Sequence, residues 1–138
     1  MANTKPVGLT KDVGWQIGAR ATLDVSSRIL WDALISPAGV CVWLGECINI
    51  EWRKGAGYRL PDGTVGAVRV FKPYSHLRLT WQPPSYPRPS TIQVHAISKG
   101  NRAVLAFHQE HLPDQQARFV RRDFFRQALD NFKTLLAL

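Results

Sequence analysis

The stretch DQQARFVRRDFFRQALDNFKTLLAL, residues 114–138, has the pattern of a single amphipathic helix. Asp114 is a favourable N-cap residue, and no glycine or proline interrupts the residues after it. Apolar residues recur at helical spacing along one side: Ala117, Val120, Phe124, Ala128, Phe132 and Leu135. Arginines four residues apart share the opposite side, which we expect to be solvated: Arg118, Arg122 and Arg126. Such a broad apolar stripe requires a large surface to pack on.

The residues before this helix are expected to build that surface. Alternating apolar residues predict a strand over residues 15–22, and two short helices follow at 27–35 and 38–44. Strand-like runs separated by turn residues come next, at 47–52, 56–60, 64–71, 76–81, 90–97 and 102–110. This order predicts an α+β fold in which a curved antiparallel sheet of six to seven strands wraps around the C-terminal helix. Space for a small ligand is expected between the sheet and that helix.

Length and composition favour one domain. The 138 residues are enough for a single sizeable core, and we expect a flexible N-terminal tail at residues 1–14 and a single domain at 15–138. The sequence shows no signal peptide and no run of transmembrane length, so we expect a cytoplasmic protein without a membrane partner. Cys41 and Cys47 lack metal-type or redox-type spacing and are expected to be free thiols.

The net charge of +8 arises in the segment from Arg53 to Arg102, which holds nine basic residues and one acidic residue. These basic residues are scattered singly, without the clustered, aromatic-interleaved pattern of nucleic-acid surfaces. We therefore expect them to solvate the outer face of the sheet, with an anionic ligand or partner as the alternative, and we expect no nucleic-acid partner. Arg69 shares strand parity with apolar neighbours, but an outward orientation is the simpler expectation.

Several short motifs, in this order, carry a resemblance to a known superfamily: Leu30-Trp31-Asp32-Ala33-Leu34 with Ser36-Pro37 and Val42-Trp43-Leu44, Gly55-Ala56-Gly57, Gly63-Thr64-Val65-Gly66, Leu77-Arg78-Leu79-Thr80-Trp81, and Phe107-His108. The sequence resembles the SRPBCC or START-like superfamily, and within it the branch of homologues of the activator of the heat-shock protein 90 ATPase. The resemblance implies a helix-grip fold with a deep, mostly apolar cavity between sheet and C-terminal helix. It does not imply one activity, because superfamilies host many functions.

The candidate ligand-binding residues are rings and small apolar groups at positions near the expected cavity: Trp43, Tyr58, Trp81, His108, Val120, Phe124 and Ala128. Many relatives carry a tryptophan in the C-terminal helix, and we expect Phe124 or Phe125 to take its place. Along this helix, Val120, Phe124 and Ala128 are predicted to face the cavity, and Phe132, Leu135 and Leu136 to lock its closed end. The main hypothesis is a protein that binds a small apolar or aromatic ligand, with or without an anionic end.

His108 is the one candidate for catalysis. It shares strand parity with Val104 and Ala106, so we expect it to point inward, either as a ligand contact or acid–base group or as a hydrogen-bonded core histidine. By the same parity, Leu105 and Phe107 would face outward and mark a dimer contact, which leaves monomer and homodimer open. No metal site and no cofactor are predicted, because the sequence holds no supporting motif.

Two further hypotheses remain beside ligand binding. One is a chaperone-associated module that acts through its surface, as the branch name of the resemblance suggests. The other is an aromatase/cyclase-like enzyme that uses His108 and polar groups of the cavity. We expect binding rather than catalysis, since no catalytic constellation accompanies the histidine.

Overall fold

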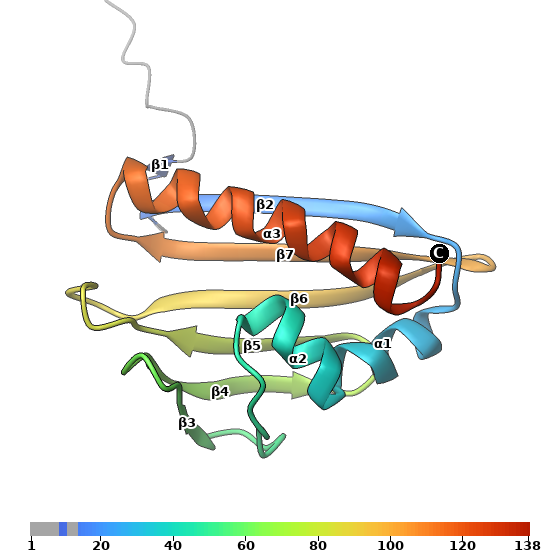
Figure 1. The fold of residues 1–138 in the computed structure, drawn as a ribbon, viewed down its shortest axis with the longest axis horizontal. Coiled ribbons are helices and arrows are strands. Elements are labelled where there is room, and N and C mark those ends of the chain that lie inside the picture. Colours follow the sequence, from blue (N-terminus) through green and yellow to red (C-terminus); the bar gives the residue numbers. More distant parts are fainter. Residues whose placement is uncertain (1–8, 11–13) are drawn as a thin grey trace, which may run out of the picture.

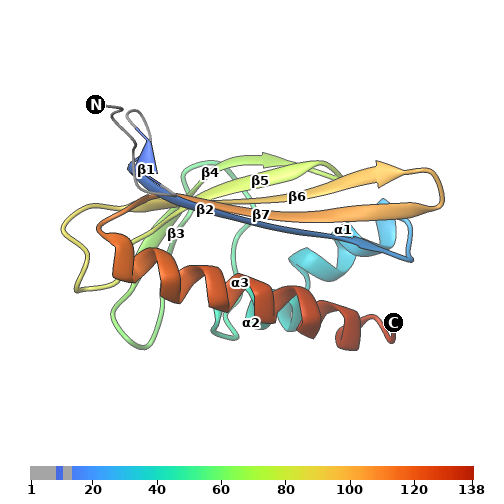
Figure 2. The same cartoon turned by 90° about the horizontal axis from the view of Figure 1, so that it is seen from above.

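A computed structural model describes residues 9–10 and 14–138, which form one antiparallel sheet of seven strands with helices packed on one face (Figures 1 and 2). The strands are β1 (Leu9–Thr10), β2 (Gly14–Leu23), β3 (Gly57–Arg59), β4 (Val65–Lys72), β5 (His76–Trp81), β6 (Ser90–Lys99) and β7 (Arg102–Leu112). The helices are α1 (Ser27–Ile35), α2 (Pro37–Leu44) and α3 (Gln115–Leu135). The predicted fold class, a curved antiparallel sheet with a long C-terminal helix, is confirmed.

The strand order is β1-β2-β7-β6-β5-β4-β3. Consecutive hairpins make β3 to β7 a meander, and β2 returns to pair with β7. The register breaks in β2, between Trp15 and Ile17, and in β4, between Val68 and Val70. Such irregularities increase local twist and bend a strand, which helps the sheet to curve around α3.

Each helix begins at a side-chain cap. Ser26 Oγ accepts a hydrogen bond from Ile29 N at 3.2 Å, and Ser36 Oγ accepts one from Gly39 N at 3.1 Å. Asp114 caps α3 through its Oδ1, as the sequence predicts. Polar caps satisfy backbone N–H groups that have no partner inside the helix.

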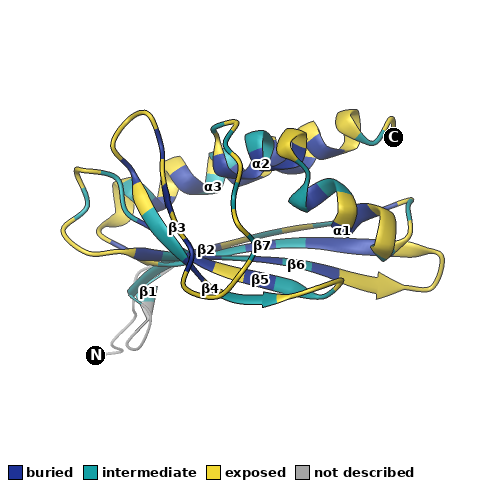
Figure 3. Ribbon diagram, turned by 90° about the horizontal axis from the view of Figure 1, so that it is seen from below, coloured by how far each residue is buried: buried dark blue, intermediate teal, exposed yellow. Residues whose placement is uncertain are grey.

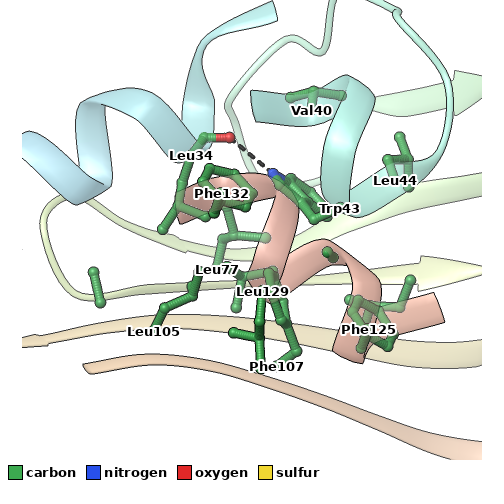
Figure 4. Close-up of a cluster of buried hydrophobic side chains, with 14 of the residues drawn as sticks. Leu34, Val40, Trp43, Leu44, Leu77, Leu105, Phe107, Phe125, Leu129 and Phe132 are labelled. Carbon is green, nitrogen blue, oxygen red and sulfur yellow. Dashed lines mark hydrogen bonds between the residues drawn. The ribbon is translucent and has the colours of Figure 1, made fainter. Parts of the chain in front are cut away.

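The core lies between the middle of the sheet and the helices, and Figure 3 shows the buried segments on these facing sides. The ring centroid of Phe107 in β7 lies 4.9 Å from that of Phe125 and 6.4 Å from that of Phe132, both in α3. Trp43 of α2 enters the same cluster and donates from Nε1 to Leu34 O at 2.8 Å (Figure 4). Side chains therefore fill the centre of the space between sheet and α3.

The prediction of which side chains of β7 face the interior is wrong. Leu105 and Phe107 are fully buried against the helices, so they cannot form an exposed dimer contact, and His108 lies on the opposite, outer face. Both sides of this strand carry apolar residues from Ala103 to Phe107, so alternation alone could not choose the inner one. The larger Leu105 and Phe107 side chains occupy the core because they remove more apolar surface from water.

The prediction of which side of α3 is buried is also partly wrong. Phe132 and Ala128 are buried as expected, but Val120 is 55% exposed and Leu135 is exposed at the end of the helix. Arg118, expected on the solvated side, is buried against the sheet. The buried positions repeat at spacings of three and four residues: Arg118, Arg121, Phe125, Ala128, Leu129 and Phe132.

Two other expectations differ from the structure. Residues 47–52, predicted as a strand, connect α2 to β3 without forming one. Cys41 and Cys47 are joined in a disulfide, so the prediction of free thiols is wrong.

Residues 1–8 and 11–13 of the predicted tail lie outside the described residues, whereas Leu9–Thr10 pair with β2. No helix in the described part of the chain is long and apolar enough to cross a membrane.

Candidate functional site at the start of α3

A chain of buried polar groups crosses the sheet beneath the second turn of α3. Arg121 is only 6% exposed, and its Nε donates to Oε1 of Gln109 in β7 at 2.8 Å. Gln109 Nε2 donates to Ser90 Oγ in β6 at 2.9 Å, and Ser90 Oγ donates to the backbone oxygen of Trp81 in β5 at 2.6 Å. Three adjacent strands thus combine to position one guanidinium group.

Aromatic rings surround the same guanidinium group. Arg121 Cζ lies 3.9 Å from the ring centroid of Trp81, 4.4 Å from that of Phe124 and 5.0 Å from that of Phe125. Tyr86, from the loop between β5 and β6, meets Trp81 edge-on at 5.5 Å. Cations are attracted to the faces of aromatic rings, so these rings partly replace the hydration that Arg121 loses on burial.

Within the part of the chain that the structure describes, no acidic side chain neutralises the charge of Arg121. Among residues 9–10 and 14–138, no carboxylate oxygen lies within 4.0 Å of its nitrogens, and its buried Nη2 has no hydrogen-bond partner. The buried Nε1 of Trp81 also lacks a partner there. Burial lowers the pKa of Arg121 to about 10, an effect that Tyr86 and Tyr58 oppose. Arg121 is therefore still a cation at neutral pH, and an unpaired buried charge is energetically unfavourable.

A pocket of about 540 Å³ opens beside this group, between the β5–β6 loop and the first two turns of α3. Its lining residues are Ser85, Tyr86, Pro87, Pro113, Asp114, Gln116, Ala117 and Val120. A second pocket, of about 440 Å³, shares Pro87 and Pro113 with the first. Tyr86 lines the first pocket and also meets Trp81 edge-on, so its side chain lies between the pocket and the rings around Arg121.

Backbone contacts hold the loop that carries Tyr86. Tyr86 N donates to Pro83 O at 2.9 Å, and Gln82 Nε2 donates to Tyr86 O at 3.0 Å. Burial raises the pKa of the Tyr86 hydroxyl, an effect that Arg121 opposes. The loop is thus anchored at its backbone, while the ring of Tyr86 is a half-buried wall of the pocket.

Tyr58 of β3 supports the site from the far edge of the sheet. Its hydroxyl donates to the backbone oxygen of Thr80, next to Trp81. Burial raises the pKa of Tyr58, with Arg121 acting in the opposite direction. Tyr58 therefore stays a neutral hydrogen-bond donor.

The structure separates the predicted ligand-binding residues into groups. Trp81 and Phe124 lie together around Arg121, and Val120 lines the pocket from its exposed position. Trp43 and Ala128 are fully buried in the core, where Trp43 already has a hydrogen-bond partner.

His108 is not part of this site, which corrects the prediction that it points inward. On the outer face of the sheet, His108 Nε2 lies 2.7 Å from Gln16 Oε1 and Nδ1 lies 3.1 Å from Glu110 Oε1. His76 and His95 stack on the same face with ring centroids 5.0 Å apart. Within the described ranges, no three His, Cys, Asp or Glu residues are arranged to hold a metal ion.

Sequence reasoning missed Arg121, Gln109, Ser90 and Tyr86. A signal for Arg121 was present, because it occupies the three-and-four spacing that continues from Phe132 through Ala128 and Phe125. No comparable signal marks Gln109 or Ser90, since their partners are distant in sequence. The exposed arginines expected in the middle segment are observed, and Arg69 is among them.

Comparisons with known proteins agree with this fold. Residues 24–137 match the sequence model of the family described as "Activator of Hsp90 ATPase homolog 1-like protein". No curated protein matches the sequence.

Solved structures with a similar fold share little sequence with this chain. CalU16 from Micromonospora echinospora has a TM-score of 0.72 at 19% identity, over 86% of this chain and 74% of that one. A heat-shock protein 90 activator from Plasmodium falciparum has a TM-score of 0.72 at 16% identity, over 88% of this chain and 96% of that one. DynU16, a protein of the dynemicin biosynthetic locus, has a TM-score of 0.71 at 11% identity, over 88% of this chain and 47% of that one. At such identities the likeness shows the fold alone.

Proposed function

Since the chain belongs to the family of activator of Hsp90 ATPase homolog 1-like proteins, we propose that it is a small-molecule binding protein of the helix-grip type. The ligand is an apolar or aromatic molecule that binds between the β5–β6 loop and the first two turns of α3. The observation that carries this proposal is the pocket of about 540 Å³ lined by Tyr86, whose ring meets Trp81 edge-on. Sites for small molecules are typically concave and combine apolar walls with some polar groups. Here the apolar part of the lining is Pro87, Pro113, Ala117 and Val120, and the polar part is Ser85, Tyr86, Asp114 and Gln116.

This proposal places the ligand at one end of α3 instead of along its whole length. The middle of the helix packs on Phe107 through Phe125 and Phe132, so the core there is already filled. Of the predicted ligand contacts, Trp81, Val120 and Phe124 remain in the proposal. Trp43 and Ala128 support the fold, and His108 is left out because it lies on the other face of the sheet.

A blocking variant tests the position of the site. Ala117 lines the pocket, so Ala117→Trp is expected to fill it, whereas Gln127→Trp places the same ring on an exposed position of α3 outside the pocket lining. Native mass spectrometry of protein purified from its own host is expected to show a retained ligand in the parent protein and in Gln127→Trp but not in Ala117→Trp. The same spectra report whether the chain is a monomer or a homodimer. Equal retention by both variants would refute the proposed position.

A second candidate function is a chaperone-associated module. It is favoured by the family description and by the similar fold of the Plasmodium falciparum activator. Such a module would act through exposed residues and would keep its activity when the pocket is blocked. The measurement is stimulation of the ATPase of a purified heat-shock protein 90 by the parent protein and by Ala117→Trp. No stimulation by the parent protein would exclude this candidate.

The proposed location of this activity is the cytoplasm. The disulfide between Cys41 and Cys47 is the one observation against this location, because a reducing compartment disfavours such a bond. Fractionation of host cells reports the compartment of the protein, and thiol labelling of each fraction reports whether the two cysteines are oxidised. Recovery from a secreted or periplasmic fraction would refute the cytoplasmic assignment.

A further inference from the structure

The buried face of α3 carries two arginines, and their surroundings differ in one respect. Arg118 Nε donates to the backbone oxygen of Gln16 at 3.0 Å. Arg121 has one partner at Nε, the Gln109 side chain, while its buried Nη2 has none in the described part of the chain. The N–H groups of a buried arginine normally all have hydrogen-bond partners, because a buried donor without one destabilises the folded protein by about 1–3 kcal/mol. Tyr86, which lines the pocket, meets the same Trp81 ring that Arg121 covers.

The orientation of the guanidinium group limits what can approach it. Its Cζ lies over the ring of Trp81 at 3.9 Å, and the rings of Phe124 and Phe125 lie 4.4 Å and 5.0 Å away, so aromatic rings occupy much of the space around the group. Hydrogen bonds from a guanidinium group leave it in its plane, along its N–H bonds. The partner of Nη2 must therefore be an acceptor that reaches the edge of the group.

Access to that edge runs past Tyr86. Its ring forms one wall of the pocket and rests edge-on on Trp81, while its backbone is tied to Pro83 and Gln82. Ligand access to Arg121 would require a rotation of the Tyr86 side chain, and neither of these backbone contacts would have to break. A ligand that replaces this ring can also stack against Trp81.

On this basis we infer that Arg121 receives the carboxylate of the bound ligand, and that the ligand class is flat, monoanionic carboxylic acids with an aromatic or apolar body. This inference rests on the proposed function and adds the chemical class of the ligand. A carboxylate supplies both the missing counter-charge and an in-plane acceptor for Nη2. A phosphate fits less well, because a dianion requires several donors and because the carboxylate of Asp114 in the pocket lining repels a dianion more than a monoanion.

The test compares two ligands that differ in charge and share their shape, 2-naphthoate and 2-naphthamide. Binding is measured by anisotropy of naphthyl fluorescence at pH 7, with the thermal midpoint of every variant recorded. The parent protein is expected to bind 2-naphthoate at least about tenfold more tightly than 2-naphthamide, since a buried charge-assisted hydrogen bond is formed only by the acid.

Variants then assign this preference to one side chain. Arg121→Gln is expected to bind both compounds equally, whereas Arg121→Lys retains part of the preference because it keeps the charge. Arg118→Gln is the matched control, since Arg118 is a second buried arginine of the same helix face but its Nε donates to the backbone oxygen of Gln16 instead of to the polar chain beneath Trp81. This variant is expected to keep the full preference.

The outcomes separate the two proposals. Equal binding of acid and amide by the parent protein overturns the carboxylate inference and leaves the proposed function intact, and this comparison needs no folded variant. Loss of the preference in Arg118→Gln as strongly as in Arg121→Gln also overturns the assignment to Arg121. Failure of both compounds to bind, together with absence of a retained ligand in native mass spectrometry, overturns the proposed function itself.

Discussion

Replacement of Arg121 by methionine tests whether this charge is retained for function or for stability. Burial lowers the pKa of Arg121 from its ordinary value of 12.5 to about 10, a difference that corresponds to about 3 kcal/mol of unfavourable free energy in the folded protein at neutral pH. Methionine removes this term and fills the space between the rings with a flexible apolar chain. The loss is the hydrogen bond to Gln109 Oε1, which becomes an unsatisfied acceptor at a penalty of about 1–3 kcal/mol.

The gain from removing the buried charge and the loss from leaving Gln109 Oε1 without a donor nearly cancel. The free energy of unfolding of Arg121→Met is therefore expected to lie within about 2 kcal/mol of the parent value. Arg121→Met combined with Gln109→Leu removes the unsatisfied acceptor as well. In this variant Ser90 Oγ loses the hydrogen bond that it accepts from Gln109 Nε2 but keeps the one that it donates to the Trp81 carbonyl. We therefore expect the double variant to be more stable than the parent protein by about 1–3 kcal/mol, as found when both partners of a buried polar pair become apolar.

The assay is urea denaturation at pH 7, followed by far-ultraviolet circular dichroism. Arg118→Met is the matched control and is expected to destabilise, because it leaves a backbone carbonyl of Gln16 without its donor. A loss of more than about 3 kcal/mol in Arg121→Met, with no recovery in the double variant, would show that the arginine is a structural requirement and would refute the reasoning.

The same charge predicts a pH dependence with a defined sign. Because the pKa of Arg121 is lower in the folded protein than in the unfolded chain, unfolding takes up a proton above about pH 10. The stability of the parent protein relative to Arg121→Met should therefore rise as the pH increases beyond 10. The difference between the two proteins removes most of the contribution of other groups that titrate in this range.

Three further predictions concern the fold. Gly39→Ala would place a Cβ 1.8 Å from the backbone oxygen of Ala33, so we expect a loss of about 3 kcal/mol or more in urea denaturation, and a loss below about 1 kcal/mol would contradict this packing. Asp114→Ala removes the N-cap bond to Ala117 N and is expected to lower stability by about 1 kcal/mol, measured in the same way; no change would mean that the cap is dispensable. Burial chiefly lowers the pKa of His95 from 6.5, so its neutral form is favoured by folding, and stability should decline as the pH falls below about 6.5, less steeply in His95→Gln.

The sequence alone was sufficient for the fold class and for most element positions. Helix α1 and strand β5 have the bounds that capping and alternation predict, and the turn residues separate the meander strands correctly. These signals are local, because an N-cap, a proline or a glycine acts on residues within one turn of itself. The helix α3 was likewise predicted from its own spacing and from Asp114.

The tertiary structure decided which side of each element is buried. In β7 both parities are apolar, so only packing against α3 shows that Phe107 faces inward and His108 outward. In α3 the ordinary exposure of arginine argued for a solvated Arg118, yet the long side chains of Arg118 and Arg121 reach polar groups of the sheet.

The candidate site depends on this tertiary packing. Residues that follow one another in the chain do not build it: Arg121 meets Gln109, Ser90 and Trp81 only because β5, β6 and β7 lie side by side beneath α3. The periodicity of residues 114–138 by itself determined that a long helix would cover the sheet. Only the assembled fold determined that the helix buries an arginine with no carboxylate beside it among the described residues, and that Tyr86 lies between this arginine and a pocket. Hydrogen bonds and burial between distant segments do not depend on local spacing.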